Sequence, residues 1–242
     1  DIDSALKGPV IKRFYVKLFW FWLPALCVRY ITVISEFTKQ ELEQIIPLSK
    51  HKIRVVPNAV NKVFRSAPYV FNATCPTILC MGTKANKNLE RVIAAISNIN
   101  CKLHIIGALS LRQIDLLNQF KIKYKNSFNL SQAEIVEAYG TCDLLCFPST
   151  YEGFGMPIIE AQVVGRPVLT ANLGAMLEVA KDAACLVDPF SVKSIESGIN
   201  RIILDKVFRE DLIKKGFKNI ERFQIESVIK DYLTIYKELI NE

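Results

Sequence analysis

Residues 144–161 read LLCFPSTYEGFGMPIIEA, and this stretch decides the fold. It opens with a continuous apolar run, Leu144–Phe147, which is typical of a strand buried on both faces of a parallel sheet. A loop with two glycines follows, and Pro157 suits the first turn of a helix. Because open parallel sheets bind ligands at the carboxyl ends of their strands, this loop is the first place to look for a site.

The same alternation of strand and helix runs along most of the chain. Short β-rich runs are mostly separated by segments with helical spacing, which favours a Rossmann-like, doubly wound α/β domain over residues 58–205. Ser131-x-x-Glu134 and Thr38-x-x-Glu41 both have the form of a capping box at a helix start. The predicted strands are Tyr30–Ile34, Lys52–Val56, Thr77–Met81, Lys102–Ile106, Leu144–Phe147 and Pro167–Thr170.

Two further regions flank this domain. Residues 1–57 are predicted to add a helix, a strand, a second helix and a second strand of another unit. The boundary is expected between Pro57 and Pro76, where turn residues are frequent and periodicity is weak. Residues 206–242 have helical periodicity, which predicts two amphipathic helices at the C-terminus.

The composition excludes several classes of protein. A chain of 242 residues with 50% hydrophobic content is long enough to bury a core. Its seven cysteines form no C-x-x-C pair and it has only two histidines, so neither a zinc finger nor a disulfide framework is indicated. Reduced thiols in the cytoplasm fit best. Asp1-Ile-Asp3 has the form of a metal-binding D-x-D, but it has no partner ligand, and we expect no metal.

The positive charge is concentrated near the N-terminus. Lys and Arg outnumber Asp and Glu by 11 to 5 in residues 1–66 and balance at 10 each in residues 67–190. Residues 10–29 combine cations with Trp20 and Trp22, and the apolar part is too short to span a bilayer. A buried helix that packs on a segment outside this chain is the simplest interpretation, and a helix on an anionic membrane surface is an alternative. No nucleic-acid-reading motif accompanies the cations, so we expect no nucleic-acid partner.

Two loops carry the candidate chemistry. Gly82-Thr-Lys-Ala-Asn-Lys-Asn88 follows one strand, and residues 148–155 follow another, so Lys84 and Lys87 are expected to face Glu152 and Glu160. Neither loop is a P-loop or a complete dinucleotide fingerprint. A solvated loop would explain the two lysines equally well.

The start of the helix after the second loop predicts an anion site. Gly153 and Gly155 allow close approach of the backbone to a ligand, and Met156 cannot cap the helix. An anion such as a diphosphate would satisfy the free N–H groups. Glu160, placed in the first turn, would accept hydrogen bonds from two neighbouring hydroxyls such as those of a ribose, and Glu152 would meet the other end of the ligand. The helix dipole alone also explains a glutamate near a helix start.

These motifs, in this order, resemble family 4 retaining glycosyltransferases, whose fold is GT-B and whose signature is Glu-x7-Glu. The resemblance covers most of the chain. It rests on ITVISEFTKQEL, IRVVPNAV, ILCMGTKANKNLERVIAAI, EAYGTCDLLCFPSTYEGFGMPIIEAQVVGRPVL and LEVAKDAACLVDP.

The resemblance implies a role for each matching residue. Lys87 would hold the donor diphosphate, Glu160 the nucleotide ribose, and Glu152 the transferred sugar. The remaining donor-binding residues implied are Gly82, Thr83, Lys84, Asn129, Leu130, Gly153, Phe154, Gly155, Met156 and Pro157. Many members have arginine where this chain has Thr83, and Lys84 would supply that charge.

The resemblance also implies the reaction. A sugar would pass from a nucleotide diphosphate sugar, with UDP or GDP as the nucleotide, to a saccharide or lipid-linked acceptor, with retention and without cofactor or metal. Asp1 resembles an aspartate that follows a histidine in the acceptor domain, so this chain would be the donor-binding half and incomplete in catalysis. The protein would be cytoplasmic or peripheral at the cytoplasmic face of the membrane. The alternatives are a non-catalytic nucleotide-binding module and a nucleotide-sugar epimerase of the same fold.

Overall fold

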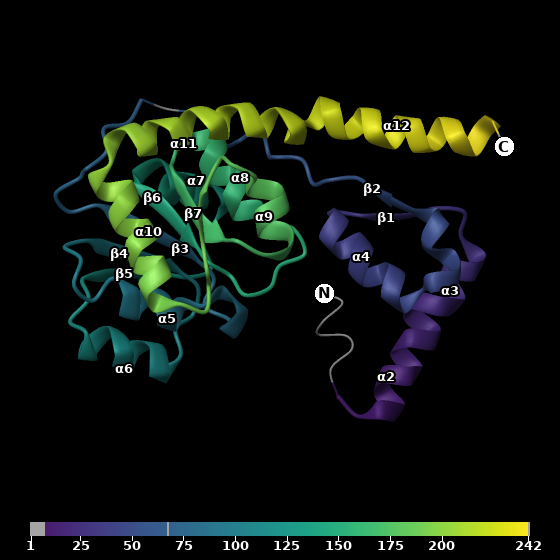
Figure 1. Cartoon of the computed structure of the whole chain (residues 1–242), viewed down its shortest axis with the longest axis horizontal. Helices are drawn as coiled ribbons and strands as arrows, with labels where there is room; N and C mark the ends of the chain where they lie inside the picture. The colour runs from purple at the N-terminus through teal and green to yellow at the C-terminus, as the bar shows by residue number, and fades with distance from the viewer. Residues whose placement is uncertain (1–7, 67, 242) are drawn as a thin grey trace.

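The computed structural model describes residues 8–66 and 68–241, so Asp1 and Asp3 lie outside the described residues. Figure 1 shows a larger α/β body and a smaller group of elements, with the C-terminal helix α12 running along the smaller group. The strands of the larger body are β3 (Thr77–Met81), β4 (Lys102–Ile106), β5 (Tyr124–Ser127), β6 (Leu144–Phe147), β7 (Val168–Ala171) and β8 (Cys185–Val187).

These strands form one six-stranded parallel sheet in the order β5-β4-β3-β6-β7-β8. The chain builds outward from β3 to one edge, then returns to β6 and builds outward to the other. This is the doubly wound arrangement predicted from the sequence. Its switch point lies between β3 and β6, and a crevice is expected beyond the carboxyl ends of these two strands.

Helices cover both faces of the sheet, and each face has its own apolar core. On one face Ile93, Leu117 and Ile199 pack with the strands. They come from α5 (Leu89–Ala95), α6 (Leu111–Gln119) and α10 (Val192–Leu204). On the other face Tyr139, Ile158 and Met176 do so. These belong to α7 (Gln132–Thr141), α8 (Met156–Val164) and α9 (Gly174–Ala180). Burial on both faces explains why the inner strands are apolar throughout.

The smaller group contains a second sheet. β1 (Ile31–Val33) and β2 (Ile53–Val55) pair in parallel, joined by α4 (Glu36–Ile45) and a short 3-10 turn at Pro47–Lys52. Both strands predicted here are present, each one residue shorter at either end. Leu42 and Ile45 of α4 pack against this sheet. The correction concerns the helix cap: Ser35, not Thr38, caps α4, and its hydroxyl accepts the N–H of Thr38 at 3.0 Å.

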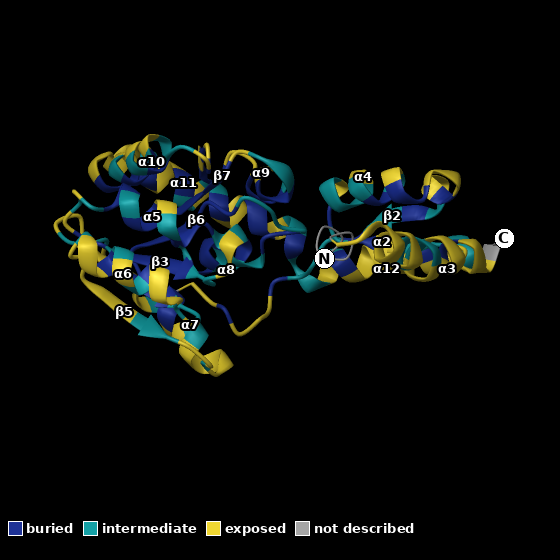
Figure 2. Ribbon diagram, turned by 90° about the horizontal axis from the view of Figure 1, so that it is seen from below, coloured by how far each residue is buried: buried dark blue, intermediate teal, exposed yellow. Residues whose placement is uncertain are grey.

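The helical run at the N-terminus is exposed in this chain. It comprises α2 (Val10–Val16), a π-helical segment (Lys17–Trp22) and α3 (Leu23–Cys27), and Ala25 is its one buried residue. Ile11 is 85% exposed and Trp20 73% exposed. The run is therefore exposed within this chain (Figure 2), and its expected burial against a segment outside the chain stays a prediction. No helix in the described ranges is long and apolar enough to cross a bilayer.

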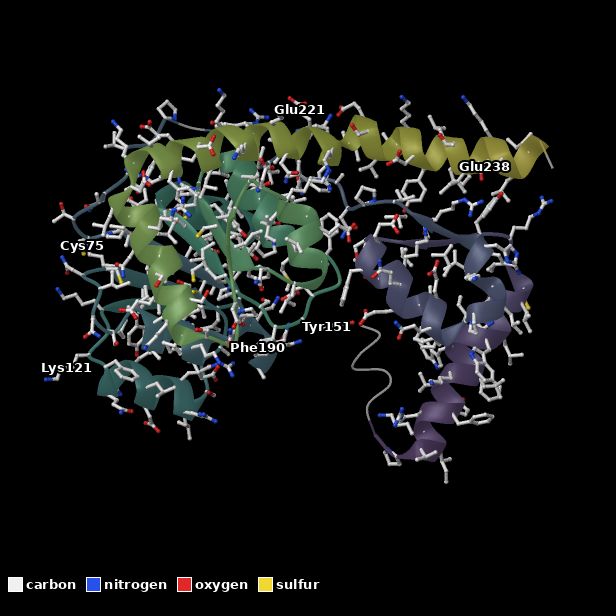
Figure 3. The ribbon with its side chains drawn as sticks, viewed as in Figure 1. Cys75, Lys121, Tyr151, Phe190, Glu221 and Glu238 are labelled. Atoms are coloured by element: carbon white, nitrogen blue, oxygen red, sulfur yellow. The ribbon has the colours of Figure 1, made fainter. Side chains whose placement is uncertain are left out.

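The C-terminal segment links the two groups. Two helices are present as predicted, α11 (Lys206–Asn219) and α12 (Ile225–Asn241), separated by a short 3-10 turn at Ile220–Phe223. Val228 and Ile235 of α12 pack on Val56, which directly follows β2. Glu238, labelled on α12 in Figure 3, forms an ion pair of 3.4 Å with Arg54 of β2.

Two strands were not predicted. β5 reads Tyr-Lys-Asn-Ser and lies at the edge of the sheet, so its sequence lacks the apolar signal of a buried strand. β8 has only three residues, Cys185–Val187, which is too short for a periodic pattern.

Candidate functional site

Lys87 and Glu152 meet at the switch point. Lys87 follows β3, and Glu152 follows β6. The ammonium donates to Oε1 of Glu152 at 2.6 Å, and the two side chains are only 21% and 16% exposed. The Lys87 Nζ also lies 4.8 Å from the ring centroid of Phe147, the last residue of β6. The structure thus brings together the cation and the carboxylate that the sequence placed on separate loops.

A glycine makes the position of Lys87 possible. Gly82 has φ +89°, which a side chain disfavours, and its amide donates to the carbonyl of Ile106 at 2.7 Å. A Cβ atom at Gly82 would lie 3.0 Å from Cγ and 3.1 Å from Cε of Lys87. Any larger residue at position 82 would therefore push the ammonium away from Glu152.

Two asparagines fasten the loops to each other. Asn86 donates from its amide to the carbonyl of Tyr151 at 3.0 Å and to Glu152 Oε1 at 3.3 Å. Asn88 is buried and donates to the carbonyls of Pro148 at 3.0 Å and Pro189 at 2.6 Å. The loops after β3, β6 and β8 are therefore held in one arrangement. Sequence reasoning missed both roles, for which an asparagine at the turn before a helix is the only available signal.

The start of α8 lacks a side-chain cap, as predicted. Gly155 is the N-cap residue with φ +109°, and no side chain accepts a hydrogen bond from the first turn. Met156 and Pro157 begin the helix. The N-terminal end of α8 therefore presents partial positive charge to the same region as Lys87.

Glu160 differs from the prediction in two respects. It is the fifth residue of α8 and so lies in the second turn, and its carboxylate accepts the hydroxyl of Tyr139 at 2.7 Å instead of facing a lysine. Burial raises the pKa of Glu160, although the hydrogen bond from Tyr139 acts in the other direction. Burial, followed by the nearby Glu160 charge, raises the pKa of Tyr139 well above its usual value.

A cleft of about 460 Å³ collects most of the predicted residues. It is lined from both groups of elements, so its walls are α4 on one side and the two sheet loops on the other. The predicted residues in its lining are Lys87, Glu152, Gly153, Phe154, Gly155, Met156 and Pro157; the others are Ile34, Thr38, Glu41, Asn58, Asn86 and Tyr151. Figure 3 labels Tyr151 at the place where the two groups approach each other.

Side chains of α4 and its cap contact the Glu152 loop directly. Ser35 Oγ donates to the carbonyl of Gly153 at 2.7 Å, and Thr38 Oγ1 donates to the same oxygen at 3.0 Å. The hydroxyl of Tyr151 donates to Glu41 at 2.7 Å. These contacts hold Tyr151 and Gly153, the residues on either side of Glu152, and so fix the position of Glu152.

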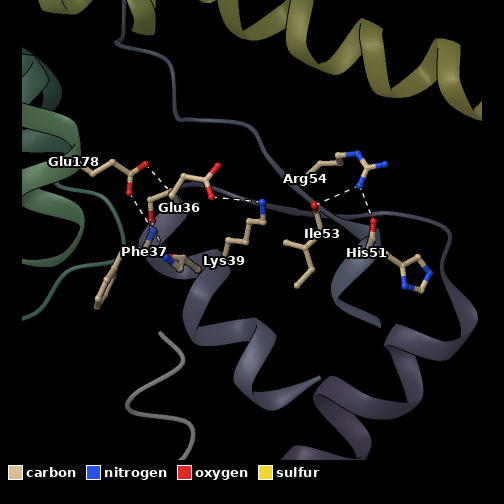
Figure 4. Close-up of polar contacts among 9 residues, drawn as sticks. Glu36, Phe37, Lys39, His51, Ile53, Arg54 and Glu178 are labelled. Atoms are coloured by element: carbon tan, nitrogen blue, oxygen red, sulfur yellow. Dashed lines mark hydrogen bonds and ion pairs between the residues drawn. The ribbon is translucent and has the colours of Figure 1, made fainter. Parts of the chain in front are cut away.

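The first turn of α4 is in turn held by α9. Glu178 accepts the backbone N–H groups of Glu36 at 2.9 Å and Phe37 at 3.0 Å, as Figure 4 shows. This contact joins residues more than 140 positions apart, so sequence reasoning had no signal for it. It adds a negative group at a helix N-terminus, where the dipole favours one.

Several predicted residues lie outside the cleft lining. Lys84 is exposed, Thr83 donates its hydroxyl to the carbonyl of Ala108 at 2.6 Å, and Gly82 lies beneath Lys87. Asn129 is exposed in a left-handed conformation two residues after β5, beside the half-buried Leu130. Glu160 also does not line the cleft. Among the described residues, no cluster of three or more His, Cys, Asp or Glu side chains could hold a metal ion.

Known proteins are similar to this chain in sequence and in fold. A family model described as glycosyl transferases group 1 matches residues 65–219. An uncharacterised glycosyltransferase of Methanocaldococcus jannaschii is 26% identical over 231 residues, covering 86% of this chain and 59% of that protein. The O-antigen chain mannosyltransferase B of Escherichia coli is 34% identical over 101 residues, covering 42% of this chain and 26% of that protein. This chain thus spans less than two thirds of the length of these relatives.

Solved structures agree on the fold. Sucrose-phosphate synthase from Thermosynechococcus elongatus superimposes with a TM-score of 0.81 at 18% identity, covering 98% of this chain and 64% of that one. Anabaena HepE, solved in complex with UDP and glucose, gives a TM-score of 0.73 at 16% identity, with coverages of 89% and 64%. Because the family model spans more than half of the sequence, the chain belongs to the group 1 glycosyl transferases, with a GT-B type of fold.

Proposed function

We propose that this chain carries the donor-binding part of a family 4 retaining glycosyltransferase. The reaction moves a hexosyl group from a nucleotide diphosphate sugar to an acceptor hydroxyl and keeps the anomeric configuration. The observation that carries the proposal is the cleft at the switch point, where Lys87, Glu152 and the uncapped start of α8 lie together.

Each group in the cleft has a role in this proposal. The diphosphate of the donor lies between the Lys87 ammonium and the first N–H groups of α8, both of which attract an anion. Glu152 then accepts hydrogen bonds from the sugar. In the ligand-free protein these two side chains neutralise each other, so donor binding replaces their ion pair with two new contacts.

Glu160 is proposed to bind the nucleotide ribose from one turn further along α8. Its Oε2 already accepts the Tyr139 hydroxyl, so the ribose hydroxyls would share this carboxylate with Tyr139. Gly82, Thr83, Lys84, Asn129 and Leu130 would contact the diphosphate and the base from the loops beside the cleft.

Charge stabilisation explains how the chemistry proceeds without a divalent cation in this proposal. Negative charge grows on the diphosphate as it leaves the sugar. A fixed ammonium and oriented backbone dipoles stabilise that charge where it develops. Activity of the complete enzyme should therefore persist after treatment with EDTA, and its loss would indicate a required metal.

The remainder of the enzyme would supply the acceptor site. We assign residues 1–57 to the end of an acceptor domain, residues 58–205 to the donor domain and residues 206–242 to the C-terminal helices. The family model begins at residue 65, close to the proposed start of the donor domain. HepE was solved with UDP and glucose, and the Escherichia coli relative is an O-antigen chain mannosyltransferase, which supports a UDP donor and a saccharide acceptor. A GDP donor and a lipid-linked acceptor remain part of the proposal through the resemblance alone.

We also propose that residues 10–29 contact the cytoplasmic face of a membrane. Trp20 and Leu26 are exposed, and Lys12, Arg13 and Lys17 are on the same helical run. Aromatic side chains with neighbouring cations suit an anionic headgroup boundary. Sedimentation with anionic liposomes should fall when Trp20 and Trp22 are replaced by Ser, and unchanged sedimentation would contradict the membrane contact.

A melting-temperature panel with UDP, GDP, ADP and their sugars tests the central proposal. A ligand that binds only the native state raises the melting temperature, and the nucleotide sugar should raise it at least as much as the nucleotide. No shift with any of them would contradict donor binding. An N-terminally extended chain then separates the alternatives. A transferase releases nucleotide diphosphate only when acceptor is present, whereas an epimerase also releases it without acceptor. A binding module releases none under either condition.

A further inference from the structure

We call the cleft of about 460 Å³ around Lys87 and Glu152 the donor cleft. A second hollow lies at the opposite end of the sheet. Its volume is about 320 Å³, at the lower end of the range for ligand pockets. It is formed where β3, β4 and β5 begin, whereas the donor cleft lies where strands end. We call it the basic pocket and define it by Thr77, Lys102, His104, Lys123, Lys125 and Thr141.

The strand register places three lysines of the basic pocket on one face. Leu103 and Ile105 of β4 face the core under α5 and α10, so Lys102 and His104 point to the other face. Lys125 of β5 is directly opposite His104, and Lys123, two residues earlier, is on the same side.

Neighbouring elements close the pocket around these lysines. Thr77 of β3 is paired with Lys102, and Thr141 ends α7, which packs on this face of the sheet. The side chains of Lys102, Lys123 and Lys125 are all exposed.

The charge of the basic pocket is only partly compensated. No carboxylate lines it, and none of its lysines is in an ion pair within the ranges that the structure describes. Burial and then the charge of Lys125 lower the pKa of His104, so this imidazole is neutral at pH 7 and adds no charge. Its Nε2 lies 3.1 Å from the hydroxyl of Ser127. The Glu134 carboxylate accepts the backbone N–H of Ser131 at 2.7 Å, and the charge of Lys125 contributes to lowering the pKa of Glu134, so this carboxylate offsets part of the charge of Lys125.

An edge strand explains only part of this pattern. Lysines on an edge strand discourage pairing with other chains, and β5 is an edge strand. Lys102, however, is on β4, which has neighbours on both sides. Three cations around one hollow, with two threonine hydroxyls beside them, are instead the groups that bind a multiply charged anion.

We propose that the basic pocket binds a phosphate-bearing small molecule, separately from the donor cleft. Lysine ammonium groups hold phosphate as point charges, and the hydroxyl of Thr77 adds a donor to its oxygens, whereas that of Thr141 already donates to the carbonyl of Glu137 at 2.9 Å. The phosphate could belong to inorganic pyrophosphate, a sugar phosphate or a nucleotide. This inference does not depend on the proposed transferase activity.

Lysine labelling tests the site without interference from the donor cleft. The folded chain is acetylated briefly with and without pyrophosphate, and each lysine is quantified by mass spectrometry. Lys102, Lys123 and Lys125 should be protected, whereas the exposed Lys214 and Lys218 of α11 should not. If pyrophosphate changed the acetylation of the two groups of lysines by the same factor, the proposal would be overturned.

Calorimetry with matched variants gives the second measurement. Both variants carry Lys87→Gln to weaken the donor cleft, and each loses three further charges. One combines K102Q, K123Q and K125Q, and the other combines K214Q, K218Q and K230Q at exposed helical positions. Pyrophosphate should bind at least about tenfold more weakly to the first. Equal affinity in both would overturn the site.

Parallel titrations with glucose 1-phosphate and UDP identify the source of the phosphate. The ligand that binds most tightly to the control variant and loses most in the K102Q/K123Q/K125Q variant is the preferred class. If none of the three ligands binds more weakly to the K102Q/K123Q/K125Q variant than to the control variant, the proposal is overturned.

Discussion

At the scale of single residues, the pair formed by Lys87 and Glu152 organises the site. Sequence placed both on the correct loops because glycines and a strand end precede them. Their direct contact and the partner of Glu160 required the structure, because Tyr139 comes from another helix and nothing in its own neighbourhood marks it as a partner. Short-range geometry was thus predictable and side-chain pairing was not.

The first prediction concerns Lys87→Gln. Loss of the ammonium should weaken UDP binding by about 1.5–3 kcal/mol and leave uridine binding nearly unchanged, because only the diphosphate contacts the charge. Titration calorimetry with both ligands measures this. Lys214→Gln, which removes an exposed lysine of α11 far from the site loops, is the control. A UDP-to-uridine preference equal to that of the wild type would contradict the role of Lys87.

The second prediction concerns pH. Because burial raises the pKa of Glu160 in the folded protein above its ordinary value of 4.5, the folded state binds this proton more tightly than the unfolded chain. This group therefore lowers stability as pH rises from 4.5 through the folded pKa. Glu160→Gln removes the ionisable group and keeps an acceptor for Tyr139. Its melting temperature relative to wild type should rise between pH 4.5 and pH 7.

Glu134→Gln provides the control of opposite sign. Hydrogen bonds from Ser131 lower the pKa of Glu134, so the wild-type carboxylate adds stability above pH 4.5. The melting temperature of Glu134→Gln relative to wild type should therefore fall as pH rises from the folded pKa through 4.5, with little further change up to pH 7. A Glu160→Gln curve parallel to that of Glu134→Gln would show that Glu160 is not destabilised by burial.

At the scale of elements, α4 and its cap connect the small sheet to the donor cleft. Ser35 caps α4 and also donates to the carbonyl beside Glu152, so one side chain serves both groups of elements. The sequence analysis selected Thr38-x-x-Glu41 as the helix start, three residues after the cap that the structure shows. The buried strands β3, β4 and β6 were predicted at both ends because apolar runs bounded by polar residues define them.

Ser35→Ala tests this double role against Ser131→Ala, which removes an N-cap with no contact to the cleft. Each should lower the free energy of unfolding by about 1 kcal/mol, measured with urea. Only Ser35→Ala should also weaken UDP binding, because only Ser35 positions the Glu152 loop. Identical nucleotide affinities for the two variants would show that the contact with Gly153 has no part in the site.

At the scale of the whole molecule, the switch point of the doubly wound sheet is the feature on which the account depends. Its location follows from the strand order, which the alternation of strands and helices predicted, although β5 and β8 were missed. The second wall of the cleft is α4, which packs on the smaller sheet and is held by Glu178 of α9. These contacts join distant segments, so they could not be read from local sequence.

The most direct test is a crystal structure of the chain with the nucleotide diphosphate that raises its melting temperature most. The account predicts the diphosphate between the Lys87 ammonium and the first N–H groups of α8, with Glu152 released from its ion pair. A nucleotide bound elsewhere, with the pair between Lys87 and Glu152 intact, would contradict the central claim.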